Sequence, residues 1–208
     1  MQLLLTDRLT CARCGPGFGL VLLADHLVDR RVRDGVLGCP NCRDSFTVVG
    51  GFADLREPPR GALPPGLAGS PDVDAGEGGR IVALLGIVRG PGTVALVGGP
   101  ARHATLLADT VPELDVVAVD ADTRAWTDHP GVSRIVSAPG LPFFSGVLRG
   151  VVVDGRLGEA MIHEAARVTA SRCRTVVVSA PESAPRVLEK AGLNVLAAEA
   201  GTVVAARG

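Results

Sequence analysis

Four of the five cysteines form two C-x-x-C pairs, the ligand pattern of a tetrahedral metal site. The pairs are Cys11 with Cys14 in "CARC" and Cys39 with Cys42 in "CPNC", separated by 24 residues. Each pair closes a tight turn that presents two thiolates, so two turns complete a set of four sulfur ligands. Zinc is the ion that this set predicts, and iron in a rubredoxin-like cage is the chemical alternative. Since four sulfurs leave no open coordination position, we expect a structural metal and not a catalytic one.

A redox role, simple burial and disulfide bonding all fit these cysteines less well than metal binding. A redox C-x-x-C follows a strand and opens a helix, which neither pair does. Four ordinary buried cysteines would not require such regular spacing. The chain starts without a basic n-region and has no apolar run of about 20 residues. We therefore expect a cytoplasmic protein without membrane segments, in which a disulfide framework is disfavoured.

A second stretch, residues 94–108 ("VALVGGPARHATLLA"), has the outline of a nucleotide-binding turn. An apolar strand leads into the glycine pair Gly98 and Gly99, and a helical pattern follows. Glycine lets the backbone turn with positive φ and lets a ligand approach without a Cβ in the way. Gly98 and Gly99 are therefore the candidate cofactor-binding residues of this turn.

Composition restricts the partners of the chain. Its 208 residues suffice for one ordinary domain and a small appendage. The 21 basic and 22 acidic residues nearly cancel, so no overall field attracts nucleic acid or an anionic membrane. Aromatic residues make up only 3% of the chain, which argues against a surface that stacks the bases of single strands.

Proline and glycine divide the chain into two parts. Residues 57–79 contain five prolines and six glycines without an apolar periodicity, and we expect a linker there. Before it, residues 1–56 predict a small β-rich zinc ribbon, with a strand, a turn and a strand in 19–39 and one further strand in 44–55.

After the linker, residues 80–208 alternate valine-rich runs with helical patterns. This alternation predicts a doubly wound, mostly parallel α/β sheet, whose ligands lie beyond the carboxyl ends of the strands. The predicted strands are 93–98, 115–121, 133–138, 150–155, 174–180, 194–199 and 202–207. The predicted helices are 80–90, 101–110, 123–128, 158–171 and 182–192.

Five segments follow one another within residues 78–208: "VALVGGPARHA", "VDAD", "LPFFSGVLRGVVVDG", "HEAARVTASRCRTVVV" and "LEKAGLNVLAAEAG". In this order and spacing they resemble a class I S-adenosylmethionine-dependent methyltransferase. It implies a Rossmann-like methyltransferase sheet that binds S-adenosylmethionine through Gly98, Gly99 and Asp120. Asp120 would accept hydrogen bonds from the ribose hydroxyls. A solvated strand-end aspartate is the alternative at that position.

The chain departs from the family pattern at several places around this site. Ala95 stands where the family has an acid, and Val97 and Ala101 replace its first and third glycines. Their side chains crowd the approach of a ligand. Ser137 and Ala138 stand where the family often has an aspartate near the adenine amine. The predicted pocket therefore keeps only part of the family's set.

The sequence identifies no catalytic residue. No N-P-P-Y-like loop follows residues 150–155, which disfavours amino methylation of a flipped base. Asp154 in that stretch is a candidate base, with a cap or a solvated turn residue as the alternative. "HEAAR" begins like a zinc-protease helix, but Arg167 takes the place of the second histidine, so we expect a helix surface.

Residues 1–56 contain two segments, "LLLTDRLTCARC" and "DGVLGCPNCRDSFTVVGGFADL", on either side of a longer middle stretch. These two segments resemble the zinc-ribbon family of small methyltransferase activator subunits. It implies a ribbon that covers an apolar strip of a partner protein by strand addition, and the fused domain is a candidate for that partner in cis.

Two functions remain open. The first is a zinc-binding, S-adenosylmethionine-dependent methyltransferase that acts on RNA or a translation component, similar in architecture to rRNA guanine methyltransferases with an N-terminal zinc module. Charge and aromatic content do not support the RNA partner. The second is a catalytically inactive pseudo-methyltransferase that binds or regulates a protein partner through its zinc ribbon. Asp120 favours the first function, and the replaced glycines favour the second.

Overall fold

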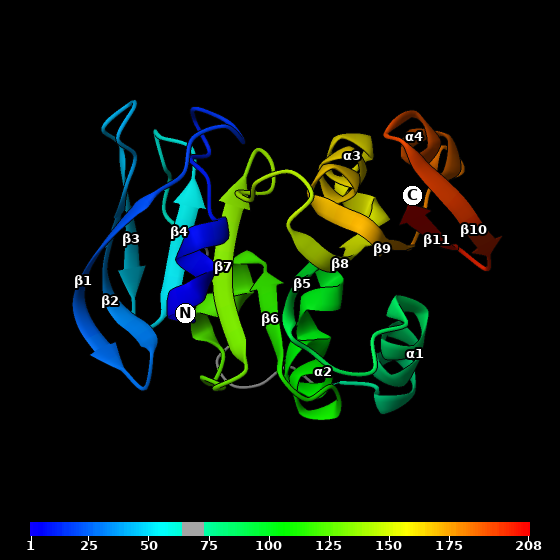
Figure 1. Ribbon diagram of the computed structural model, residues 1–208, viewed down its shortest axis with the longest axis horizontal. Helices are drawn as coiled ribbons and strands as arrows, with labels where there is room; N and C mark the ends of the chain where they lie inside the picture. Colours follow the sequence, from blue (N-terminus) through cyan, green and yellow to red (C-terminus); the bar gives the residue numbers. More distant parts are fainter. Residues whose placement is uncertain (64–72) are drawn as a thin grey trace.

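The computed structural model describes residues 1–63 and 73–208, and their strands form one continuous sheet (Figure 1). In the described residues this sheet has 11 strands in the order β1-β2-β3-β4-β7-β6-β5-β8-β9-β11-β10. Part of the linker predicted at 57–79, residues 64–72, lies outside the described residues. None of the helices in the described part of the chain has the length and apolar character needed to cross a membrane.

The N-terminal part is an antiparallel ribbon, drawn blue to cyan in Figure 1. Its strands are β1 (Val21–Val28), β2 (Arg31–Gly38), β3 (Ser45–Val49) and β4 (Phe52–Arg56). The expectation of a single strand in 44–55 is wrong, because two strands form a hairpin there. Gly50 and Gly51 turn the chain with φ values of 55° and 79°, a conformation that glycine adopts at low cost.

The C-terminal part confirms the doubly wound, mostly parallel sheet. Strands β7, β6, β5, β8 and β9 are neighbours in this order and run parallel to one another. The C-terminal hairpin of β10 and β11 joins the sheet antiparallel to β9. The strands are β5 (Gly92–Val97), β6 (Leu114–Val119), β7 (Val132–Ala138), β8 (Leu148–Asp154), β9 (Thr169–Val178), β10 (Leu193–Glu199) and β11 (Thr202–Arg207).

Helices cover the two faces of the sheet and separate its core into two clusters. One cluster includes residues of α1 (Ala75–Leu85) and α2 (Ala104–Thr110). The other includes residues of the 3-10 helix η1 (Leu3–Arg8), α3 (Glu159–Val168) and α4 (Ala184–Lys190). Alternate residues of the central strands belong to alternate clusters, which explains their uninterrupted apolar sequence.

Several helix limits differ from the predicted ones. Helix α1 begins at Ala75, earlier than predicted, because the side chain of Asp74 accepts a hydrogen bond from the N–H of Gly76 and caps it. The helix predicted at 158–171 ends at Val168, since Thr169 already begins β9. Short 3-10 helices replace the start of one predicted helix and the first half of another. These are η2 (Gly99–His103) and η3 (Ala121–Ala125), and a third, η4 (Gly155–Leu157), follows β8.

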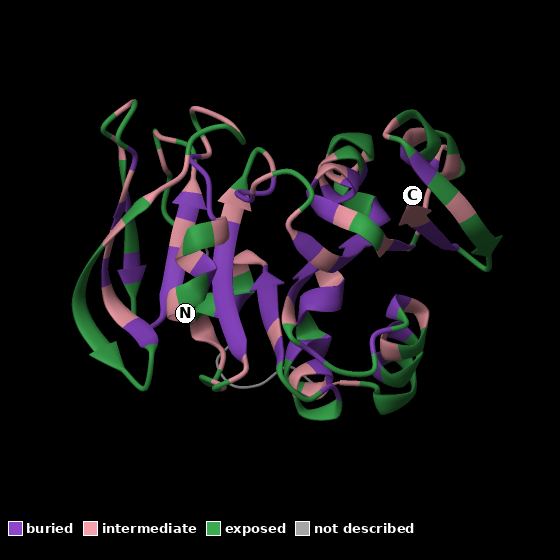
Figure 2. Ribbon diagram, in the orientation of Figure 1, coloured by how far each residue is buried: buried purple, intermediate pink, exposed green. Residues whose placement is uncertain are grey.

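The ribbon is joined to the α/β part through a parallel strand pair. Strand β4 pairs with β7 from Phe52 opposite Arg134 to Arg56 opposite Ala138. Figure 2 shows mostly buried residues along β4, β7 and β6, so the core continues across the junction. The apolar side of the ribbon and the α/β sheet therefore share one hydrophobic cluster.

Charged side chains reinforce this junction near the amino ends of β4 and β7. Arg31 of β2 donates to the carboxylate of Asp128 at 2.8 Å and to the carbonyl of Val132 at 3.2 Å. Arg134 of β7 donates to the carbonyl of Gly50 in the β3–β4 turn at 2.7 Å. The side chains of Arg31 and Arg134 are only 8% and 7% exposed, so Asp128 supplies a counter-charge to two buried guanidinium groups.

Candidate functional site

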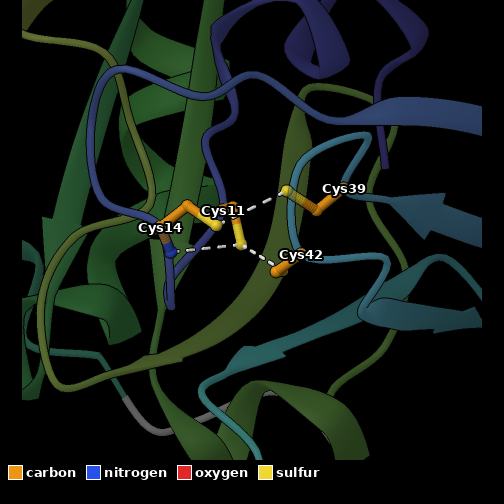
Figure 3. A group of neighbouring side chains, drawn as sticks. All are labelled: Cys11, Cys14, Cys39 and Cys42. Carbon is orange, nitrogen blue, oxygen red and sulfur yellow. Dashed lines mark hydrogen bonds between the residues drawn. The ribbon is translucent and has the colours of Figure 1, made fainter.

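The four cysteine side chains point toward one another from two turns (Figure 3). Their sulfur atoms all lie within 4.8 Å of one another. The Sγ atoms of Cys11 and Cys42 are 3.6 Å apart, and those of Cys14 and Cys39 are 3.8 Å apart. Four sulfurs at the usual zinc–sulfur distance would be separated by about 3.8 Å in a tetrahedron. The cluster therefore has the donor set and the spacing of a closed four-sulfur metal site.

The two turns hold their cysteines in similar ways. Gly15 N–H donates to the carbonyl of Cys11, and Arg43 N–H donates to that of Cys39. Gly15 has φ of 84° and Arg43 has φ of 63°, so each turn closes with a left-handed residue four positions after its first cysteine. Hydrogen bonds also reach the sulfurs, as the Asn41 side chain donates to Cys14 at 3.3 Å.

Backbone donors make a thiolate accessible in this cluster. Burial alone raises the pKa of the Cys39 thiol, but the N–H groups of Cys42 and Asn41 donate to its sulfur and bring its pKa down to about 7. The thiolate is the form that binds a metal ion. The pKa of the Cys11 thiol is instead raised, chiefly by burial, so metal binding would have to displace protons from the cluster.

The first cysteine turn rests directly on the α/β part. Thr10 N–H donates to the carbonyl of Pro142 at 2.8 Å, and Leu9 forms a β-bridge with Phe143. Both Leu9 and Phe143 are fully buried. The loop after β7 thereby fixes the segment that leads into Cys11.

Helix α3 holds that loop from the other side. The expectation of a helix surface at "HEAAR" is wrong for Arg167, whose side chain is 16% exposed. It donates to the carbonyls of Leu141 and Phe143 at 2.8 Å each and pairs with Glu164, which accepts from Leu141 N–H at 3.0 Å. A cavity of about 240 Å³ lies between the Glu164–Arg167 pair and the first cysteine turn.

The glycine turn and Asp120 lie at the carboxyl ends of neighbouring strands. Val97 at the end of β5 is opposite Val119 at the end of β6, so Gly98 and Asp120 follow these strands side by side. Gly98 has φ of 72° and donates to the carbonyl of Val119 at 3.0 Å. One carboxylate oxygen of Asp120 accepts from Asp122 N–H and caps η3. Its other oxygen accepts no hydrogen bond from the described residues.

The replaced family positions are found in two environments. Ala95, Val97 and Ala101 are buried in the core, where each methyl or isopropyl group packs against neighbours. Ser137 lies at the end of β7 and donates to the carbonyl of Gly140 at 2.6 Å. A ligand at this edge would therefore meet backbone and hydroxyl groups near Ser137 instead of a carboxylate.

Asp154 is a turn cap and an ion-pair partner, and its side chain is only 6% exposed. It accepts from Arg156 N–H at 3.0 Å and from the Arg156 guanidinium at 2.6 Å. Burial raises the pKa of the Asp154 carboxyl, but these hydrogen bonds outweigh it and hold the pKa below its usual range. A carboxylate whose pKa is lowered in this way is poorly suited to act as a general base at neutral pH.

The structure also shows contacts that sequence patterns did not indicate. The junction residues Arg31, Asp128 and Arg134 have no recognisable spacing, because they come together only when the ribbon meets β7. The Asp154–Arg156 pair has a local signal, however. An Asp-x-Arg sequence occurs at the end of two strands, β8 and β4. In the β4 copy, the Arg56 guanidinium likewise donates to the Asp54 carboxylate, at 2.9 and 2.7 Å.

Comparison with known proteins assigns the fold. The chain matches no family model, and no curated protein matches it in sequence. A structure of geranyl diphosphate methyltransferase in complex with SAM is similar, with 11% identity over 64% of this chain and 85% of that chain, at a TM-score of 0.52. Precorrin-6y C5,15-methyltransferase from Geobacter metallireducens GS-15 has 14% identity over 63% of this chain and 87% of that chain, at a TM-score of 0.51.

A complex that contains the Haloferax volcanii Trm112 methyltransferase activator also matches, with 18% identity over 57% of this chain and 68% of that chain, at a TM-score of 0.46. The geranyl diphosphate and precorrin-6y methyltransferases, both with a TM-score above 0.5, show a Rossmann-like fold of the class I methyltransferase type. The protein is therefore methyltransferase-like in fold and carries a four-cysteine cluster in its N-terminal ribbon.

Proposed function

We propose that the protein binds S-adenosylmethionine at the carboxyl ends of β5 and β6, through Gly98, Gly99 and Asp120. The observation that carries this proposal is the strand register, which puts a positive-φ glycine turn beside an aspartate with a spare carboxylate oxygen. Open α/β sheets bind ligands beyond the carboxyl ends of their strands, at the point where the strand order reverses, and here this point lies beside β5, between β5 and β8. The similar geranyl diphosphate methyltransferase was solved in complex with SAM.

The four-cysteine cluster is proposed to hold one structural zinc ion. Cys11, Cys14, Cys39 and Cys42 supply four sulfur donors with tetrahedral separations. When bound, zinc would tie the two turns of the ribbon together. Thr10 and Leu9 additionally anchor the first turn to the loop after β7.

The ribbon is proposed to act on its own α/β part, and not primarily on a separate catalytic subunit. Strand β4 adds in parallel to β7 and thereby covers what would otherwise be an exposed sheet edge. The backbone groups of β4 that would recruit another protein by strand addition are largely used within the chain. This arrangement supports a partner in cis.

Calorimetric titration with S-adenosylmethionine and S-adenosylhomocysteine tests the proposed cofactor site. Micromolar binding supports it, and the absence of detectable binding refutes it. Asp120→Ala should weaken binding about tenfold or more, because a hydrogen bond to a charged group contributes roughly 1.5–3 kcal/mol. The matched control is Asp122→Ala, which removes an exposed carboxylate two residues away. Equal effects of the two variants would remove Asp120 from the site.

A second candidate is a pseudo-methyltransferase that keeps the fold without the cofactor. The observation that favours it is the occupied space above the glycine turn. A Cβ built on Gly99 would lie 2.9 Å from Asp154 Oδ2, and one on Gly98 would lie 2.9 Å from Leu157 Cδ1. Under this candidate, the wild-type protein binds neither S-adenosylmethionine nor S-adenosylhomocysteine.

A further inference from the structure

We propose that the side chains of Asp154 and Arg156 form an internal plug over the glycine turn, and that a ligand must displace this plug to bind there. The inference rests on the proposed cofactor site, because it concerns access to that site. Asp154 would then block ligand binding, and would act neither as a base nor as a ligand-binding group. In the plugged state the carboxylate of the chain itself takes the space that a ligand would fill.

The contacts of Asp154 are directed at the turn. Its Oδ2 lies 2.9 Å from the position of a Cβ on Gly99, and its Cβ lies 3.2 Å from that on Gly98. The Asp154 side chain therefore packs directly against both glycines of the turn.

Arg156 holds this carboxylate in place. Its guanidinium donates to Asp154 through Nε at 2.9 Å and 3.1 Å and through Nη2 at 2.6 Å. The Arg156 Nη2 atom also lies 3.2 Å from the Cβ position on Gly99. The pair is thus a neutral unit that covers the turn, with the Arg156 side chain 69% exposed on its outer side.

The geometry indicates which part of the plug can move. The backbone at Gly155 is closely packed, because a Cβ there would lie 2.6 Å from the carbonyl oxygen of Ser179. Arg156 and Leu157 are exposed side chains, and Gly158 has φ of 91° with open space around its Cβ position. Rotation of the Asp154 and Arg156 side chains can therefore uncover Gly99 while β8 stays in place.

The chain contains a matched control for this pair. Asp54 and Arg56 make the same local contacts at the end of β4, with Arg56 N–H donating at 3.2 Å and its guanidinium at 2.9 and 2.7 Å. That pair contacts the carbonyl of Gly61 and not the glycine turn. Asp54→Ala therefore removes an equivalent ion pair without uncovering the proposed site.

Two measurements test the plug. The first is the affinity for S-adenosylmethionine of the wild type and of Asp154→Ala, Arg156→Met and Asp54→Ala. The second is amide hydrogen exchange of residues 97–103 in the ligand-free proteins. We expect Asp154→Ala to bind about tenfold or more tightly than the wild type, since a charge-assisted contact no longer has to be broken. Arg156→Met should gain less, up to about fivefold, because exposed ion pairs are weak. Asp54→Ala should bind like the wild type.

Exchange at the Gly99 amide should be faster in Asp154→Ala and unchanged in Asp54→Ala, whereas the Gly98 amide stays bonded to the carbonyl of Val119 in both. Weaker or unchanged binding by Asp154→Ala, when the wild type binds, overturns the plug. Unchanged exchange overturns it independently of any cofactor. If no variant binds S-adenosylmethionine but exchange at the turn is faster, the proposed cofactor site fails and the plug stands. If Asp154→Ala does not fold, the affinity for S-adenosylmethionine and the amide exchange at the turn are compared between Arg156→Met and the wild type. No change in either then overturns the plug.

Discussion

Replacing Asp128 by asparagine should destabilise the protein by about 3 kcal/mol. Asp128 lies 2.8 Å from Arg31, 2.6 Å from Arg33 and 3.5 Å from Arg134. Removing one partner of a buried ion pair costs about 3–5 kcal/mol, because the other charge is left uncompensated. The lower end applies because the Asp128 side chain is 30% exposed and both buried guanidinium groups keep their bonds to backbone carbonyls.

The pH dependence of stability follows from the same carboxylate. Burial raises the pKa of Asp128, but its hydrogen bond from Arg33 and the charges of Arg31, Arg33 and Arg134 outweigh this and lower the pKa. A carboxyl whose pKa is lower in the folded state stabilises the fold above its unfolded pKa of about 4. This contribution is lost as the pH falls through the folded pKa. The difference in stability between wild type and Asp128→Asn should therefore shrink below pH 4.

Urea denaturation and calorimetry measure this effect. At 208 residues, about 3 kcal/mol corresponds to a fall in Tm of roughly 6–12 °C. Asp109→Asn is the control, because Asp109 pairs with His129 at 3.1 Å but is 64% exposed, so its loss should cost less than about 1 kcal/mol. If Asp128→Asn costs no more than Asp109→Asn, the buried arginines do not depend on Asp128 and the reasoning is refuted.

Two further changes test the ribbon. Purified protein should contain about one zinc per chain. Cys39→Ser should lose both the metal and the ribbon's resistance to proteolysis, whereas Cys173→Ser should keep both. A fully folded ribbon without metal would contradict the zinc assignment. Leu9→Ala should cost about 2–5 kcal/mol in urea denaturation, because Leu9 is 0% exposed between the ribbon and the loop after β7. Leu4→Ala, at a side chain that is 57% exposed, should cost less than about 0.5 kcal/mol, and equal costs would exclude the proposed packing at Leu9.

Much of the fold was predictable because its signals are local. The apolar runs around Val94–Val97 and Val151–Val153 are long enough to be buried on both faces, and this pattern by itself predicts central parallel strands. Limits of elements were less predictable where a single contact decides them. The Asp74 cap starts α1 early, and the Gly50–Gly51 turn divides one predicted strand into two.

The candidate site was predictable to a smaller extent. The turn at Gly98 and Gly99 is marked by its own glycines, and Asp120 by its place at the end of an apolar run. Whether the turn is accessible depends on Asp154, which lies 55 residues further along the chain and reaches Gly99 only because β8 is the neighbour of β5. No local pattern reports such a contact.

The sequence by itself predicted the four-cysteine cluster, because each C-x-x-C turn needs only local geometry to present two sulfurs. It also predicted the class of sheet, since the central strands are uninterrupted apolar runs, which is typical of strands buried on both faces. The tertiary structure alone decided that β4 pairs with β7, that Asp128 pairs with Arg31 and Arg134, and that Asp154 covers the glycine turn. These contacts join residues far apart in the chain, and their energies depend on a burial that exists only after the two parts have packed together.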